Sequence, residues 1–429
     1  MTPSDRYHAL DSLRGFAMLL GVVLHAAVSF LQNVPPFWSV RDRNPDPLAD
    51  VFVFAVHTFR MQLFFLLAGF FGCLLYQRYG PGGMAWHRVK RVLVPFALAV
   101  VLVTPTVMGA FLYAELGNAR TEGVPDGAPP ARKVAAELIA AAPGSSDLAL
   151  VGGRLTSGEF VRFVPLAHLW FLYYLLWLYP ATLALAPVLG RLTGARFLAA
   201  FEARFRRVIE GPWRVVVPAL VTVPLLLAMH TWTSDTPLSW VPEARILGYY
   251  AFFFAFGWVL YRHRDLVPAF GRGWRTSLAV ANLLVLPVAL VVLFSGIDAE
   301  HALARGEPGP APLVAFRALT FAAQAAYTWL MIIGLWGACL HYFSRERAWV
   351  RYLADSAYWC YLASITPIVL LQFWVKDWPL PGLLKWAFVS AAAMALLLLS
   401  YELFVRYTFV GATLNGRKTR AKAAVPREA

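Results

Sequence analysis

The chain has 429 residues, of which 59% are hydrophobic and 14% are charged, and its formal net charge is +14 at pH 7. Soluble domains average roughly 45–50% apolar and about 25% charged residues, so this composition excludes an ordinary soluble protein and indicates an integral membrane protein. Cys73, Cys339 and Cys360 all lie in apolar runs, which supports neither a disulfide framework nor a zinc site. We read them as small buried hydrophobic residues and predict no metal site.

Ten apolar stretches approach the length of about 20 residues that a helix needs to cross a membrane. We therefore predict an all-α fold, a polytopic membrane helix bundle of about ten transmembrane helices. The N-terminus does not resemble a cleavable signal, because Asp5, Asp11 and Arg14 crowd the start of a span-length apolar run. The predicted spans are 12–32, 52–77, 90–114, 166–189, 213–231, 246–262, 275–296, 315–342, 350–375 and 382–409.

Basic residues concentrate in every second connection between these spans and in the C-terminal tail. Lysine and arginine enrichment marks cytoplasmic loops, so the even-numbered connections and both termini are predicted to be cytoplasmic. This orientation accounts for most of the net charge of +14 without a nucleic-acid partner. Two connections have further features. The outward connection 115–165 contains a possible amphipathic helix over 132–142, and the inward stretch 190–210 interleaves arginine with Leu and Phe, which suits a helix at the anionic inner leaflet.

The first predicted span carries two ionisable residues, Arg14 at its start and His25 inside the apolar run. Eleven steps of about 1.5 Å separate them, so His25 is expected near mid-bilayer if Arg14 lies near one face. An ionisable group at that depth indicates a functional site, but the spacing alone equally allows a histidine that only packs within the bundle. Asp11 either orients Arg14 or caps the first helix. We favour capping, because Asp suits a helix start.

Further polar candidates follow along the chain. Arg60 lies within the second predicted span, where an arginine must face a partner or a wet cavity, and His57 lies one turn earlier on the same face. Arg88, Lys90 and Arg91 lie at the cytoplasmic mouth of the third span. Taken alone, they are ordinary positive-inside charges with snorkelling side chains, and the functional alternative is a clamp for phosphates.

His168 begins the aromatic stretch of the fourth predicted span. An interfacial belt of tryptophan and tyrosine at the outer membrane face explains Trp170, Tyr173 and Tyr174. The belt does not require a histidine, so His168 is kept as a polar site candidate.

These stretches resemble the integral-membrane acyltransferase-3 family, which moves acyl groups onto glycans and other acceptors. The resemblance rests on LDSLRGFAMLLGVVLHA, whose arginine and histidine have the family's spacing of ten intervening residues, and on FRMQLFFLLAGFF, RVKRVLVPF and HLWFLYYLLWL. It covers nearly the whole chain and predicts a single acyltransferase-3-like transmembrane domain, 1–416, followed by a basic cytoplasmic tail, 417–429. FRMQLFFLLAGFF is similar to the branch that includes the periplasmic glucan succinylating proteins. Ser364 stands where family members often carry a histidine, which leaves open whether an acceptor contact is altered.

The resemblance implies acyl transfer from cytosolic acyl-CoA to a hydroxyl of an extracytoplasmic glycan or lipid-linked sugar, at the bacterial inner membrane. His25 would act as general base, and Arg14 would hold an anionic part of the donor or orient the site. Arg88, Lys90, Arg91 and Arg60 would bind the coenzyme A moiety of this co-substrate. No tightly bound cofactor is expected, and a covalent acyl-histidine and direct transfer are both open.

Two other classes of protein stay open at this point. A secondary transporter also keeps histidine and arginine within the membrane, although no internal repeat is detectable in this chain. A structural scaffold predicts that Arg14, His25, Arg60 and Arg91 all tolerate alanine. No hydrolase-like extracytoplasmic domain is expected after the last span, so any step that needs one would require a partner protein.

Overall fold

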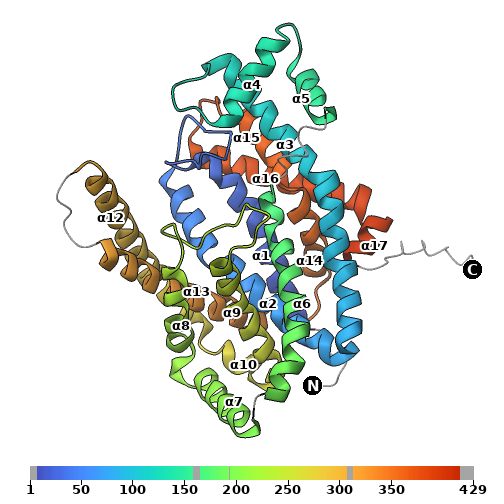
Figure 1. The fold of residues 1–429 in the computed structure, drawn as a ribbon, viewed down its shortest axis with the longest axis vertical. Coiled ribbons are helices and arrows are strands. Elements are labelled where there is room, and N and C mark those ends of the chain that lie inside the picture. Colours follow the sequence, from blue (N-terminus) through green and yellow to red (C-terminus); the bar gives the residue numbers. More distant parts are fainter. Residues whose placement is uncertain (1–6, 158–164, 193, 307–312, 416–429) are drawn as a thin grey trace, which may run out of the picture. The chain divides into compact units, whose positions relative to one another are not determined.

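The computed structural model describes residues 7–157, 165–192, 194–306 and 313–415 (Figure 1). All regular elements in these ranges are helical, as predicted, and no strand occurs in them. The predicted basic tail, 417–429, lies outside the described residues.

Two compact units divide the chain. They alternate along the sequence, so they do not correspond to two consecutive domains, and the single transmembrane domain stays a prediction. Helix α1 (His8–Ala27) begins in the first unit and ends in the second. Unit 1 contains Met1–Ala17, Pro47–Arg88 and Val164–Arg351; unit 2 contains Met18–Asp46, Val89–Phe163 and Tyr352–Ala429.

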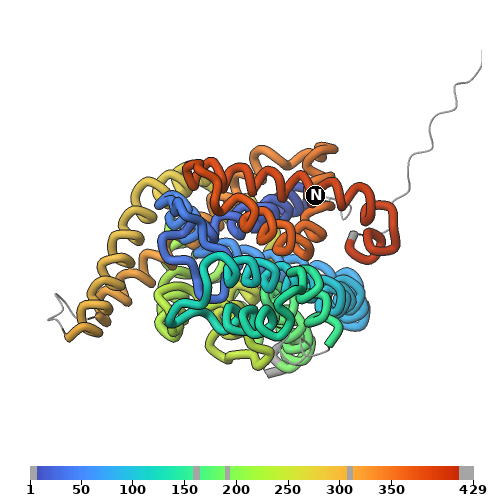
Figure 2. The backbone as a smooth tube through the Cα atoms, turned by 90° about the horizontal axis from the view of Figure 1, so that it is seen from above, coloured from blue at the N-terminus to red at the C-terminus, as the bar shows by residue number. Residues whose placement is uncertain are grey.

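Unit 1 is built on the long helix α2, which packs against α9. The two backbones approach closely through glycines: a Cβ on Gly69 would lie 1.9 Å from the Phe254 carbonyl oxygen, and one on Gly257 would lie 1.8 Å from that of Leu66. Helices α12 and α13 lie side by side (Figures 1 and 2). The helices of unit 1 are α2 (Pro47–Arg88), η4 (Ala167–Leu169), α6 (Trp170–Leu192), α7 (Ala195–Glu210), η5 (Pro212–Arg214), α8 (Val216–Leu227), α9 (Ala244–Arg262), η6 (Arg264–Leu266), α10 (Val267–Phe270), α11 (Trp274–Val280), η7 (Ala281–Val285), α12 (Leu286–Ala304) and α13 (Leu313–Tyr342).

Helix α7 covers most of the inward stretch in which arginines alternate with Leu and Phe. It meets the apolar helix pair η5 and α8 at an angle of 96°. One side of α7 is tied to unit 1 through ion pairs of Glu202 with Arg262 and of Arg206 with Asp265, whereas Phe197 is exposed. A helix with this sequence and this bend suits a membrane surface, and its place at the inner leaflet stays a prediction.

Unit 2 is built on α3, and α4 and α5 pack against it (Figure 1). Leu116, Ala135 and Leu150 are buried together where the three helices meet. Helix α4 confirms the amphipathic helix that the sequence predicted over 132–142, shifted by one or two residues. The helices of unit 2 are η1 (Val28–Phe30), η2 (Val89–Leu93), α3 (Val94–Glu122), α4 (Pro130–Ala141), α5 (Asp147–Thr156), most of α14 (Ala348–Ala363), α15 (Ile365–Val375), α16 (Gly382–Ser400), η8 (Tyr401–Val405) and α17 (Phe409–Asn415).

Each of the ten predicted spans contains helix. Within the described part of the chain, seven helical stretches are long and apolar enough to cross a membrane, or up to nine if each of two bent helix pairs is one crossing. One of the seven, Pro47–Glu122, has 76 residues, and Gly80 interrupts its helical backbone with a φ of 68°. The count of ten and the cytoplasmic termini stay predictions.

The predicted span 350–375 is not one straight helix. Its two parts, α14 and α15, meet at 68°, with Ser364 between them. Pro367 explains the break, because proline has no backbone N–H and its ring clashes with the carbonyl four residues earlier.

Candidate functional site

Arg14 lies near the start of α1, in unit 1. Its Nη2 atom is 3.3 Å from Oδ1 of Asp11, and its guanidinium carbon is 5.8 Å from the centre of the Phe71 ring. Our preference for Asp11 as a helix cap was wrong, because α1 begins at His8 and the Asp11 N–H already donates to the Tyr7 carbonyl. Asp11 instead orients Arg14, the alternative that the sequence left open.

His25 lies in the last turn of α1, which ends at Ala27. The sequence placed it well inside the first span, and the structure places it close to the end of the helix. The imidazole stacks on the indole of Trp38, with ring centroids 6.3 Å apart and an interplanar angle of 18°. The main-chain carbonyl of His25 accepts a hydrogen bond of 3.0 Å from Nε2 of Gln372. Both contacts lie within unit 2 and fix the end of α1 that carries the imidazole.

Trp38 and Gln372 are held by each other. The indole Nε1 of Trp38 donates to Oε1 of Gln372 at 3.0 Å and to Oγ of Ser29 at 3.1 Å. Gln372 also donates to the carbonyl of Ala26 at 3.0 Å. Neither residue was predicted from the sequence, although a glutamine inside an apolar span is a signal of a buried polar contact.

The loop 31–46 follows His25 and closes over a buried ion pair. Nζ of Lys385 lies 2.6 Å from Oδ1 of Asp42, and the two side chains are 0% and 1% exposed. Lys385 also donates to the carbonyls of Lys376 and Trp378. Oδ2 of Asp42 has no hydrogen-bond partner among the described residues. Burial raises the pKa of Asp42, although Lys385 acts in the opposite direction.

A second lysine anchors the same loop. Nζ of Lys376 donates to Oδ1 of Asn118 at 2.6 Å and to Oε1 of Glu122 at 2.8 Å. Nδ2 of Asn118 in turn donates to the carbonyl of Ser39 at 2.9 Å. Helices α3, α15 and α16 therefore all contribute polar side chains to the loop that carries Trp38. None of these contacts was predicted from the sequence.

The residues of the predicted phosphate clamp have separate surroundings. In unit 1, the guanidinium carbon of Arg88 lies 4.3 Å from the centre of the Tyr179 ring. In unit 2, Nη1 of Arg91 donates to the carbonyls of Thr413, at 2.9 Å, and Ala412, at 3.4 Å, while Lys90 is exposed. Arg91 thus holds helix α17, a structural role that the sequence did not predict. Joint action of Arg88, Lys90 and Arg91 on a ligand stays a prediction.

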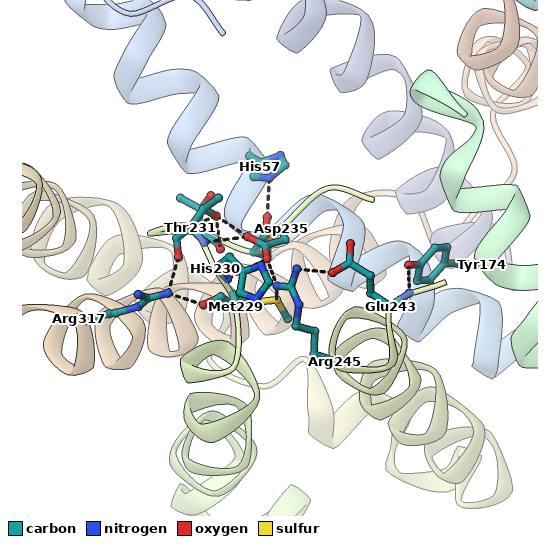
Figure 3. A network of polar contacts seen from close by, with 11 residues as sticks. His57, Tyr174, Met229, His230, Thr231, Asp235, Glu243, Arg245 and Arg317 are labelled. Carbon is teal, nitrogen blue, oxygen red and sulfur yellow. Dashed lines mark hydrogen bonds and ion pairs between the residues drawn. The ribbon is translucent and has the colours of Figure 1, made fainter. Parts of the chain in front are cut away.

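His57 and Arg60 both lie on α2. Arg60 is buried, and Nε2 of His57 donates to the carbonyl of Ser234 at 3.2 Å (Figure 3). One turn further on, Nε2 of Gln62 donates to the hydroxyl of Tyr249 at 2.9 Å. These contacts belong to unit 1 and tie α2 to α9 and to the loop between α8 and α9.

That loop, 228–243, is closed by Asp235 (Figure 3). The carboxylate accepts the backbone N–H groups of His230, at 2.9 Å, and Thr231, at 3.0 Å, as well as the Thr231 hydroxyl at 2.6 Å, and it pairs with Arg245. Burial alone would raise the pKa of Asp235, but these hydrogen bonds lower it to about 2.

The aromatic residues of the fourth predicted span do not all form the interfacial belt that the sequence predicted. His168 lies in η4, directly before α6. Trp170 and Tyr174 are buried, and Trp170 packs on Tyr250 with ring centroids 5.2 Å apart, so the belt interpretation was wrong for these two residues. Both rings are part of the apolar core of unit 1, because a large aromatic ring makes more stabilising contacts when it is buried than at an exposed position.

Ser364 lies at the break between α14 and α15. It is buried, and its hydroxyl donates to the Tyr361 carbonyl at 3.4 Å. Ser364 thus occupies a helix junction, and its relation to an acceptor stays a prediction.

Cys73, Cys339 and Cys360 are buried, as the sequence predicted. The described residues contain no group of three or more His, Cys, Asp or Glu side chains that could hold a metal ion.

Comparison with known proteins defines the class. The family model described as Acyltransferase domain, of the acyltransferase-3 type, matches residues 7–402. Together with the apolar helices, this match makes the chain a multi-pass integral membrane protein. The chain belongs to the acyltransferase-3 family.

Two similar relatives agree with the narrower resemblance. Glucans biosynthesis protein C from Escherichia coli (strain SMS-3-5 / SECEC) is 37% identical over 103 residues, 24% of this chain and 26% of that protein. The protein of the same name from Shigella dysenteriae serotype 1 (strain Sd197) is 32% identical over 124 residues, 29% of this chain and 30% of that protein. These alignments cover less than a third of the relatives' length. No solved structure matches the chain.

Proposed function

We propose that this protein is a membrane acyltransferase that moves an acyl group from cytosolic acyl-CoA to a hydroxyl of an extracytoplasmic glycan or lipid-linked sugar. Family membership supports acyl transfer, and the names of the relatives support a glycan acceptor. The observation that carries the proposal is the placement of His25, whose ring stacks on Trp38 and whose carbonyl is held by Gln372.

His25 acts as the general base in this proposal. It takes the proton of the acceptor hydroxyl while that oxygen bonds to the thioester carbonyl carbon. The carbon–sulfur bond then breaks, and the imidazolium returns the proton to the departing coenzyme A thiolate. A base must lie within hydrogen-bond reach of the proton that it removes, so a fixed imidazole favours the reaction. Attack by His25 itself, which forms an acyl-imidazole before the acceptor reacts, is the alternative order.

The donor binds through basic residues on the predicted cytoplasmic side. Coenzyme A carries a 3′-phosphate and a pyrophosphate, which suit Arg88, Lys90 and Arg91. Arg14, oriented by Asp11, holds an anionic part of the donor, and buried Arg60 is a further donor-binding candidate. In a bacterial inner membrane, the acceptor would arrive from the outer side, with a separate extracytoplasmic protein where a further step needs one.

The purified protein, reconstituted in liposomes, tests this function directly. We expect it to release coenzyme A from acyl-CoA and to add the acyl mass to a β-glucan acceptor, measured by a thiol assay and by mass spectrometry. His25→Ala should lower the rate by about 10²–10⁴-fold. His341→Ala is the matched control, because His341 is an exposed histidine near the end of α13. An unchanged rate in His25→Ala would exclude His25 as the base, and no transfer by the wild type to any glycan tested would exclude the acceptor class.

A further inference from the structure

Unit 1 has a shallow pocket of about 450 Å³ where α8 ends and α13 begins. It does not include any residue proposed for acyl transfer. Its walls combine an arginine and a histidine with apolar side chains, and they come from Leu227, Ala228, Met229, His230, Val314 and Arg317.

Arg317 provides the positive charge of this pocket. It reaches from α13 to the loop 228–243, where Nη2 donates to the carbonyls of Met229 and Thr231 (Figure 3). Its guanidinium carbon also lies 5.6 Å from the centre of the Phe321 ring. None of these partners is a carboxylate, and Nε is buried without a hydrogen-bond partner among the described residues. The guanidinium therefore lies at the pocket wall with carbonyl and aromatic partners but no carboxylate among these contacts, which favours an anionic ligand there.

His230 gives a second polar group on a fixed backbone. Its side chain is exposed, while its backbone N–H is held by the carboxylate of Asp235 at 2.9 Å. Because Asp235 and Arg317 fix the loop on both sides of His230, the imidazole projects from a rigid support. An arginine and a histidine on one pocket wall are donors for the oxygens of a phosphate.

The apolar part of the wall indicates which kind of phosphate. Leu227 is 43% exposed and Val314 is 76% exposed, and both line the pocket together with Arg317 and His230. A free inorganic anion gains nothing from exposed aliphatic surface, whereas an amphiphile buries its chain there. The predicted orientation also places the connections 232–245 and 297–314 on the outer side, at the level of the lipid headgroups.

We propose that this pocket binds the phosphate group of a phospholipid. Arg317 and His230 donate to the phosphate oxygens, and an acyl chain of the lipid lies along Leu227 and Val314. The site is distinct from the acyl-transfer site, and it stands whether or not His25 is the catalytic base.

Binding of phosphatidylglycerol to the full-length protein tests the proposal. The protein is delipidated in detergent, and its occupancy by the lipid is titrated by native mass spectrometry, with thermal unfolding in parallel. We expect Arg317→Gln to weaken binding by about tenfold, the loss of one charge-assisted contact, and Arg317→Lys to recover part of it. His230→Gln should show a smaller loss. Lys133→Gln removes one exposed positive charge on α4 and serves as the matched control.

Two results would overturn the proposal. The first is an affinity of Arg317→Gln and His230→Gln within about twofold of the wild type, less than a single lost hydrogen bond is worth. The second is equal protection of the wild type by inorganic phosphate, which would identify a site for the free anion. His230→Gln decides the outcome if Arg317→Gln does not fold, because the exposed imidazole supports no loop contact.

Discussion

Two loops of this protein each bury one aspartate against a cationic side chain, and they do so in different ways. In unit 1, Asp235 accepts two backbone N–H groups and a hydroxyl from its own loop before it pairs with Arg245. In unit 2, Asp42 accepts one backbone N–H from its own loop, that of Asn44, and depends on Lys385 for its second contact.

The difference shows in the pKa values of the two carboxylates. Local hydrogen bonds lower the pKa of Asp235 to about 2, although burial acts against them. Burial raises the pKa of Asp42, and one of its oxygens has no hydrogen-bond partner among the described residues. Asp235 is therefore held mostly by groups of its own loop, whereas Asp42 depends on a lysine from a helix far along the chain. The environment of His25 is built from long-range contacts.

The largest effect on stability is expected from Lys385→Met. The substitution leaves the buried Asp42 carboxylate without its cation, which costs about 3–5 kcal/mol. Arg43→Met is the control in the same loop, because Arg43 pairs with Asp377 at the surface, with side chains 73% and 50% exposed. A surface pair contributes at most about 1 kcal/mol. Denaturant unfolding in detergent measures both, and equal losses would show that the buried pair has no special role.

The second largest effect is expected at acid pH, where the two aspartates should contribute differently to stability. The pKa of folded Asp235, about 2, is below its ordinary value of 3.8. The ionised Asp235 therefore contributes fully to the free energy of unfolding above pH 4, and this contribution is lost as the pH falls toward 2. The shift corresponds to about 2 kcal/mol. The wild type should lose this amount relative to Asp235→Asn between pH 6 and pH 2, measured as the difference in free energy of unfolding.

Asp42 should show the opposite dependence. Its raised pKa means that the folded state holds the proton more tightly than the unfolded chain does, so its contribution falls as the pH rises above 3.8. The difference between the wild type and Asp42→Asn should consequently have the reverse slope to that for Asp235→Asn. Slopes of the same sign for the two variants would contradict the contrast between the loops.

Substitutions of two glutamines should have the smallest effects on stability of this series, and only one of them should slow acyl transfer. Gln372→Leu removes the hydrogen bonds to Trp38 and to the carbonyls of His25 and Ala26, at a cost of about 1–2 kcal/mol, and should slow acyl transfer by about tenfold. Gln324→Leu, in unit 1, removes a donor to the Trp232 carbonyl. It should lower stability by about 1 kcal/mol and leave the rate of the folded protein unchanged. Similar rate losses in both would mean that Gln372 acts only through stability.

The helices were predictable because apolar stretches of span length depend only on local sequence, and helix occurs in all ten predicted spans. The catalytic roles of Arg14 and His25 stay predictions, but the place of both residues on the first helix was predictable. The partners of His25 were not, because Trp38 and Gln372 meet across 334 positions of the chain. The break at Ser364 had a local signal in Pro367, but the span 350–375 was predicted from its hydropathy alone. Asp11 was misassigned because the helix begins earlier than its composition suggested.

The most direct test measures His25→Ala and Asp235→Asn side by side, each for acyl-transfer rate per folded molecule and for free energy of unfolding. For His25→Ala we expect a rate loss of about 10²–10⁴-fold with stability changed by less than about 1 kcal/mol. Asp235→Asn should lose about 2 kcal/mol of stability and keep the wild-type rate. Acyl transfer by His25→Ala at the wild-type rate would contradict the central claim that the imidazole at the end of α1 is the catalytic base.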